Sequence, residues 1–263
     1  MAHESNINFK NMTDLYFTDQ GKGKTLVLIH SGGTDLRDWE MITPELASEY
    51  RIIMYDQRGA GQSPVPIEPT NHITDLEDLL DSINEKRVIL IGHSMGGQIA
   101  TDFALKHPEI VEKLILIAPG LTGFEYDLEF QTQVKRIWEV VPNVDKMLDV
   151  MLNTSKAYAV QIGMSSPLKE RIIEVHRENI EKSLTWKNME QVWIEPPTIE
   201  RLREIKSDTL FIVGTKDKKD LFRIKTLFNQ LSNIIFKDVE NADHVLTWTH
   251  SKELLTTIRE FID

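Results

Sequence analysis

The feature that most constrains the fold is a serine with a glycine two residues before it and another two residues after it. Ser94 stands between Gly92 and Gly96, after the apolar run 88–91 and before the helix-like stretch 98–105. A strand that turns this sharply into a helix leaves no room for side chains at the two glycines and strains the serine backbone. The pattern is typical of a nucleophile elbow, which exposes the serine hydroxyl beside the unpaired N–H groups of a helix N-terminus. It therefore predicts a reactive serine that faces an oxyanion site.

Composition is ordinary for a globular protein and excludes several other classes. The chain has 263 residues, which is near the upper end of what one domain normally holds. Its formal charge of −11 argues against a nucleic-acid partner and against a polybasic membrane patch. The chain has no cysteine, which excludes a disulfide scaffold, a thiol nucleophile and thiolate metal sites.

No segment of the sequence is typical of export or of membrane insertion. The N-terminal residues 1–6 are polar and lack a basic region followed by an apolar one. No apolar run approaches the ~20 residues that a membrane-spanning helix requires. We therefore expect a cytoplasmic protein, and no feature of the sequence specifies an oligomeric state.

Short apolar runs alternate with helix-like stretches along much of the chain. Six runs suit buried parallel strands: 26–29, 52–55, 88–91, 114–117, 210–213 and 234–236. The stretches between the early runs have helical character: 39–49, 73–85 and 98–107. This alternation predicts an α/β fold with a mostly parallel, doubly wound sheet. Two weaker alternating segments, 6–9 and 15–18, predict an antiparallel hairpin at the sheet edge.

The alternation stops after residue 120. From 121 to 197 no strand-like run occurs, and four apolar residues are spaced for one buried helical face: Val134, Ile137, Trp138 and Val141. We therefore predict a helical cap at 121–197, inserted into an α/β core formed by 1–120 and 198–263. Most of its large apolar side chains should form the core of the cap, and one or two should line a substrate pocket: Phe124, Tyr126, Trp138, Met147, Met151, Tyr158, Met164, Trp186 and Trp193.

A serine hydroxyl is a weak nucleophile at neutral pH and needs a base within hydrogen-bonding reach. In an open parallel sheet, the loops at the carboxyl ends of the strands form the ligand crevice where Ser94 would lie. His244 occupies such a loop, after the run 234–236 and before the last helix. Among the eight histidines it fits the base best, whereas His93 should face away from the crevice and pack structurally.

The acid that orients the base should also follow a strand. Asp217 comes directly after the strand that ends at Gly214, and its carboxylate could hold the histidine tautomer. Asp220, three residues further on, is the nearest rival. At that position its carboxylate would instead stabilise the first turn of the next helix. Glu125 and Asp127 are the next candidates.

An oxyanion hole needs two N–H donors. One should be Met95, immediately after the nucleophile, and the other should come from the loop 30–34 after the first parallel strand. Gly32 is the preferred donor in that loop, with Gly33 as its alternative, because glycine lets the backbone approach a ligand closely.

Together these segments resemble the α/β-hydrolase family, in particular cofactor-free esterases and 3-oxoadipate enol-lactonases. The stretch 30–33 (His-Ser-Gly-Gly) is similar to the family's His-Gly oxyanion loop, although Ser31 stands where the family usually has glycine. The stretch 56–63 is similar to its Asp-x-Arg-Gly-x-Gly-x-Ser loop. The resemblance covers almost the whole chain, and Asp217 and His244 match the acid and base positions of the family.

The expected function is that of a serine hydrolase that cleaves a small carboxylic ester or lactone without a cofactor. A dinucleotide cofactor is not expected, because Gly59 and Gly61 are not followed by the third glycine of that fingerprint. Dehalogenase and epoxide hydrolase chemistry is also not expected, since those relatives use aspartate as the nucleophile. Two alternatives remain: hydrolysis of a carbon–carbon bond on the same triad, and a non-catalytic sensor that holds a small ligand under the cap.

Overall fold

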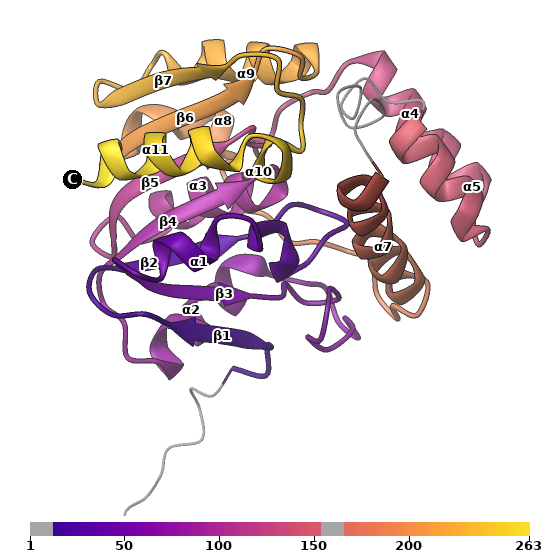
Figure 1. Cartoon of the computed structure of the whole chain (residues 1–263), viewed down its shortest axis with the longest axis horizontal. Helices are drawn as coiled ribbons and strands as arrows, with labels where there is room; N and C mark the ends of the chain where they lie inside the picture. Colours follow the sequence, from indigo (N-terminus) through magenta and orange to yellow (C-terminus); the bar gives the residue numbers. More distant parts are fainter. Residues whose placement is uncertain (1–12, 154–165) are drawn as a thin grey trace, which may run out of the picture.

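A single mostly parallel sheet forms the centre of the molecule (Figure 1). In the residues that the computed structural model describes, 13–153 and 166–263, seven strands lie in the order β1-β3-β2-β4-β5-β6-β7. Their bounds are β1 Phe17–Gln20, β2 Thr25–Ile29, β3 Arg51–Tyr55, β4 Val88–His93, β5 Val111–Ile117, β6 Asp208–Gly214 and β7 Ile234–Val239. Strand β1 is antiparallel to β3, and the other neighbouring pairs are parallel. The predicted doubly wound α/β sheet is confirmed.

The helices fall into two groups. The core helices are α1 Thr43–Leu46, α2 His72–Ser82, α3 Met95–Lys106, α8 Thr198–Arg201, α9 Lys219–Phe228, α10 Leu246–Thr249 and α11 Ser251–Ile262, with the short 3₁₀ helices η2 Leu36–Trp39 and η5 Leu202–Glu204. The described part of the predicted cap contains α4 Leu128–Glu139, α5 Val144–Leu148, the π-helical turn η3 Asp149–Asn153 and α7 Ser166–Ser183. In Figure 1, helices α4, α5 and α7 lie to one side of the core, beyond one end of the central strands.

The central strands are apolar along their whole length because both of their faces are covered. Every residue of β2 and of β4 is buried. Such continuous apolar runs are typical of parallel strands with helices on both sides of the sheet. Each of the six predicted runs lies within one of the strands β2 to β7. At the sheet edge the pattern weakens, and Ile235 in β7 is exposed.

Two predictions about the N-terminal half need correction. The predicted hairpin is only partly described: residues 17–20 form β1, but their partner is β3, and residues 6–9 lie outside the described residues. The predicted helix at 39–49 is instead the 3₁₀ turn η2 followed by the four-residue helix α1. The Asp35 side chain caps η2 by accepting from the N–H of Arg37, and Pro44 occupies the first turn of α1. Proline favours the start of a helix, which explains the break before α1.

The predicted buried face of α4 is wrong for two of its four residues. Val134 is 37% exposed and Trp138 is 54% exposed, and helix α4 contains no buried residue. Ile137 and Val141 do pack against a small apolar cluster that includes Met147 and residues of α7. This cluster is separate from the core of the sheet, so only a narrow stripe of α4 packs against other residues.

Two of the residues that were predicted to lie in the cap, Tyr158 and Met164, are outside the described residues. No helix within the described ranges is long and apolar enough to cross a membrane.

We predict that the closeness of the elbow to β2 makes Gly96→Ala strongly destabilising. A Cβ at Gly96 would lie 2.0 Å from the carbonyl oxygen of Ile29, a backbone atom that cannot move without disturbing the sheet. The matched control is Gly32→Ala, whose Cβ would meet nothing nearer than the Met95 sulfur at 3.6 Å. Urea denaturation should show a loss of about 3 kcal/mol for Gly96→Ala and less than about 1 kcal/mol for Gly32→Ala. Equal losses would contradict this account of the packing.

Candidate active site

The backbone of Ser94 is strained, as the elbow predicts. Its φ of 53° and ψ of −113° lie in a region that non-glycine residues rarely adopt. Two neighbouring segments hold this conformation. The Ser94 N–H donates to the carbonyl of Ile117 at 2.9 Å, and the Ser94 carbonyl accepts from the N–H groups of Gln98 and Gly120. The strain therefore places the hydroxyl at the junction of β4 and α3.

The structure brings Ser94, His244 and Asp217 together. The Nε2 atom of His244 lies 2.9 Å from the Oγ of Ser94. The Nδ1 atom of His244 lies 3.0 Å from Oδ2 and 3.2 Å from Oδ1 of Asp217. Because a carboxylate only accepts, Nδ1 carries the proton, and the Nε2 lone pair faces the serine hydroxyl. This arrangement can withdraw a proton from Ser94.

Burial sets the protonation states of this group. Burial lowers the pKa of His244 below its ordinary 6.5, and the neighbouring Asp217 offsets this only in part. Burial works against ionisation of Asp217, but the attraction and hydrogen bond of His244 hold the pKa of its carboxyl below the ordinary range. At neutral pH the histidine is therefore a free base beside a charged carboxylate, which is the state that a general base requires.

Asp220, the rival acid, lies elsewhere. It is in the first turn of α9 and is buried, where it accepts from the N–H of Asp127 at 2.9 Å and pairs with Arg223 at 2.6 Å. It therefore ties α9 to the start of α4 and does not contact His244. Asp127 itself caps α4 by accepting from the N–H of Phe130.

Gly32 and Met95 lie side by side next to Ser94. A Cβ built on Gly32 would lie 3.7 Å from the Cβ of Met95. Within the described part of the chain, neither of their N–H groups donates to a protein acceptor. The N–H of Ser31, by contrast, donates to Asp38 at 2.9 Å, so it is not available to a ligand. Gly33, the alternative donor, contacts the cap through its carbonyl, which lies 2.9 Å from Nδ1 of His176, and among the described residues its N–H also has no protein acceptor.

A second buried histidine–aspartate pair lies behind the elbow. His93 faces away from the crevice, as expected, and its Nδ1 lies 2.8 Å from Oδ2 of Asp38. Its Nε2 lies 2.8 Å from the carbonyl oxygen of His244. Asp38 also accepts from Thr247 at 2.9 Å and from the indole of Trp248 at 3.3 Å. One carboxylate thus links the loop 30–34, the elbow and the segment that follows His244.

Both members of this pair are charged. Burial alone would lower the pKa of His93, but the charge and hydrogen bond of Asp38 raise it above the ordinary value. Burial likewise opposes ionisation of Asp38, and His93 with the other donors holds its pKa far below the usual range. A protonated His93 can donate from both ring nitrogens, one to Asp38 and one to the His244 carbonyl. Sequence reasoning missed Asp38, because only its neighbour Trp39 stands out as a core residue.

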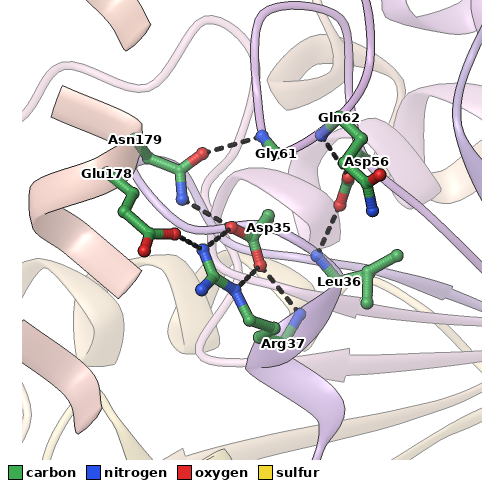
Figure 2. A pocket seen from close by; sticks show the side chains of 8 residues that line it. All are labelled: Asp35, Leu36, Arg37, Asp56, Gly61, Gln62, Glu178 and Asn179. Carbon is green, nitrogen blue, oxygen red and sulfur yellow. Dashed lines mark hydrogen bonds and ion pairs between the residues drawn. The ribbon is translucent and has the colours of Figure 1, made fainter. Parts of the chain in front are cut away.

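The cap reaches the active-site loops through polar contacts (Figure 2). Arg37 pairs with Asp35 on its own loop and with Glu178 on α7, each at 2.6 Å. In Figure 2 the Asn179 side chain lies between Asp35 and Gly61; its amide nitrogen donates to the former and its oxygen accepts from the N–H of the latter. These residues border a pocket of about 280 Å³. Helix α7 therefore docks on the loops after β2 and β3.

The loop 56–63 has a structural task. Asp56 accepts from the N–H groups of Leu36 and Gln62 at 2.8 and 2.7 Å, which joins this loop to η2. Gly61 has a φ of +43°, and a Cβ there would lie 2.1 Å from Asp56 Oδ2, so only glycine fits.

Among the described residues, no cluster of three or more histidine, aspartate or glutamate side chains could hold a metal ion.

Comparison with known proteins identifies relatives along nearly the whole chain. Residues 24–147 match the family model described as alpha/beta hydrolase fold. The chain is 30% identical over 268 residues to the 2-hydroxy-6-oxononadienedioate/2-hydroxy-6-oxononatrienedioate hydrolase of Paraburkholderia phymatum, covering 94% of this chain and 90% of the relative. The protein of the same name from Escherichia coli K12 is 30% identical over 272 residues, with the same coverage of both chains.

Solved structures support the fold. The bromoperoxidase from Bacillus anthracis superposes with a TM-score of 0.78 at 23% identity, covering 94% of this chain and 95% of that one. The enol-lactonase from Burkholderia xenovorans LB400 superposes with a TM-score of 0.71 at 20% identity, covering 94% and 96%.

We predict that Asp38→Asn removes about 3–5 kcal/mol from the free energy of unfolding, because it leaves the charged His93 buried without its partner. The lowered pKa of Asp38 gives stability that is present above about pH 4 and is lost as the pH falls. The raised pKa of His93 gives stability that is full below about pH 6.5 and is lost as the pH rises through that pKa. Urea denaturation should therefore show the largest difference from the wild type between about pH 4 and 6.5.

The control for this prediction is Asp14→Asn, which removes the exposed partner of an ion pair with Arg58. Its effect should stay below about 1 kcal/mol. An Asp38→Asn effect as small as that of the control, or one that grows steadily above pH 7, would contradict the account of a buried charged pair.

Proposed function

The chain belongs to the α/β-hydrolase family, and on that premise we propose that it is a serine hydrolase that cleaves small, uncharged carboxylic esters or lactones. The single observation that carries the proposal is the hydrogen-bonded series Ser94, His244 and Asp217, in which the free Nε2 lone pair of the histidine lies 2.9 Å from the serine hydroxyl. This geometry is that of a nucleophile, its base and the group that orients the base.

The proposed reaction has two halves. His244 takes the proton of Ser94 as the serine oxygen attacks the substrate carbonyl, and the N–H groups of Gly32 and Met95 donate to the oxyanion that forms. His244 then gives that proton to the departing alkoxide oxygen, which leaves an acyl group on Ser94. In the second half His244 deprotonates a water molecule, which attacks the acyl carbonyl. The bond between the acyl group and Ser94 then breaks, and His244 returns the proton to the serine oxygen as the carboxylic acid is released.

The charges near the crevice favour uncharged substrates. Carboxylates of Asp35, Asp56 and Glu178 border the pocket between the core and α7. The cations of this region are already paired: Arg37 with two of these carboxylates, and Lys182 with backbone carbonyls such as that of Gly61 at 2.6 Å. An anionic substrate that approaches Ser94 through this pocket would meet its carboxylates without an unpaired cation from either residue.

Carbon–carbon bond hydrolysis is the second candidate, and the relatives favour it. The substrate in their names, 2-hydroxy-6-oxononadienedioate, contains no ester, so its hydrolysis must break a carbon–carbon bond. The same triad could activate water or Ser94 toward its ketone. That substrate carries two carboxylates, however, and the acidic border described above does not suit it.

A substrate panel tests these proposals. We expect p-nitrophenyl butyrate and a small lactone to be hydrolysed, and Ser94→Ala to lower kcat by at least about four orders of magnitude with an unchanged circular dichroism spectrum. Turnover of 2-hydroxy-6-oxononadienedioate without turnover of any ester or lactone would favour the second candidate. Binding without turnover of any compound would favour a sensor, and ester hydrolysis that survives in Ser94→Ala would contradict the role of the serine.

The two aspartates after β6 give a sharper prediction. Asp217→Asn should lower kcat by about 10⁴, because asparagine no longer holds the required histidine tautomer. Asp220→Asn should leave kcat within a few-fold of the wild type, since Asp220 contacts Asp127 and Arg223 and not His244. Both variants are measured on one activated ester, with circular dichroism as the check on folding. An inactive Asp220→Asn beside an active Asp217→Asn would show that the acid is misassigned.

A further inference from the structure

A cavity of about 150 Å³ adjoins the oxyanion loop, on the side of α7 and the loop after β3. Gly33 and Met95 line it where it borders the active site, and Trp186 lines it from the chain after α7. The indole N–H of Trp186 donates to the carbonyl of Gly59 at 3.0 Å, which fixes the ring as a wall. At roughly 30 Å³ for each water-sized group, the cavity holds about five such groups. Its size therefore suits a short chain.

Gln57 lines this cavity and carries an unpaired acceptor. Its side chain is 1% exposed, and its Nε2 donates to the carbonyl of His30 at 2.5 Å. Because that carbonyl can only accept, the amide nitrogen of Gln57 must face it. The orientation of the amide is therefore fixed, and Oε1 points away from this bond. Among the described residues, Oε1 has no hydrogen-bond partner. A buried acceptor in this state needs a donor, which an ordered water or a ligand must supply.

His72 lines the same cavity and carries a second unpaired atom. It is 3% exposed, and its Nε2 also has no partner within the described part of the chain. Burial, with His30 and Arg58 nearby, lowers the pKa of His72 to about 4, so the ring is neutral at pH 7. Its ring stacks at a tilt on Trp193, with 5.8 Å between centroids. A neutral imidazole nitrogen can donate or accept, according to the tautomer.

We propose that this cavity is the acyl pocket and that it selects a short acyl group carrying a hydroxyl. The hydroxyl donates to Oε1 of Gln57 and pairs with Nε2 of His72. A carboxylate has no proton for the Gln57 acceptor, and an ammonium group would find no carboxylate among the residues that line the cavity. A plain alkyl chain would leave both polar atoms buried and unpaired, which a site of this kind penalises. The inference rests on the proposed function only for the position of the substrate carbonyl beside Ser94. The binding of the hydroxyl does not depend on it.

The test compares p-nitrophenyl butyrate with its 2-hydroxy and 3-hydroxy derivatives. In the wild type, kcat/KM should be roughly tenfold higher for at least one hydroxy ester than for the plain ester, as expected for pairing two buried polar atoms. The ratio should fall to about one in Gln57→Met and in His72→Phe, which keep the approximate size of each side chain. Ser183→Ala is the matched control: Ser183 lines the same cavity, but its hydroxyl already donates to the carbonyl of Ile180 at 2.7 Å, so the ratio should persist.

Binding to the Ser94→Ala protein separates this inference from the proposed function. Ligand-observed NMR titration should show roughly tenfold tighter binding of a hydroxylated methyl butyrate than of methyl butyrate, whether or not the wild type hydrolyses any ester. Equal binding of these compounds would overturn the inference, as would a hydroxy-ester preference that survives in both Gln57→Met and His72→Phe. Tighter binding of the hydroxylated ester with no hydrolysis by the wild type would support the pocket and contradict the proposed function.

Discussion

The buried pair of Asp38 and His93 is the interaction on which the geometry of the active site depends. One carboxylate, wholly removed from solvent, accepts hydrogen bonds from the oxyanion loop, from the elbow and from the segment after His244. These segments are far apart in the sequence, and each carries one part of the proposed machinery. A charged pair in the interior costs desolvation energy, and it persists only where its hydrogen bonds are complete. Here they are complete, so the pair sets the distances between Gly32, Ser94 and His244.

The sheet and the cap contribute differently to the site. The parallel strands deliver the serine, the acid and the histidine to one edge, where backbone strain at Ser94 is held by bonds to neighbouring segments. Helix α7 reaches that edge with polar side chains, and it borders the cavity that is lined by Gln57 and His72, each of which has an unpaired atom. In the proposed function, the core thus provides the reacting groups, whereas the loop after β3 and the cap provide the surroundings of the substrate.

The sequence predicted the sheet and the grouping of Ser94, Asp217 and His244 because each depends on local patterns. Apolar runs such as 88–91 are determined by burial on both faces, and Ser94, Asp217 and His244 follow strands in a recognisable order. It did not predict Asp38 or the orphaned atom of His72, because the role of a buried polar residue depends on distant partners. The exposed positions of Trp138 and Val134 were also missed, since helical spacing shows that a face is apolar but not whether anything packs against it.

The central claim is that His244 activates Ser94, and labelling with a fluorophosphonate tests it most directly. Such probes react with a serine whose hydroxyl has an adjacent base. Peptide mass spectrometry should find one label per chain, on Ser94, and His244→Gln should slow labelling by several orders of magnitude while the protein remains folded. A label on another serine, or equal labelling rates with and without the histidine, would contradict the account.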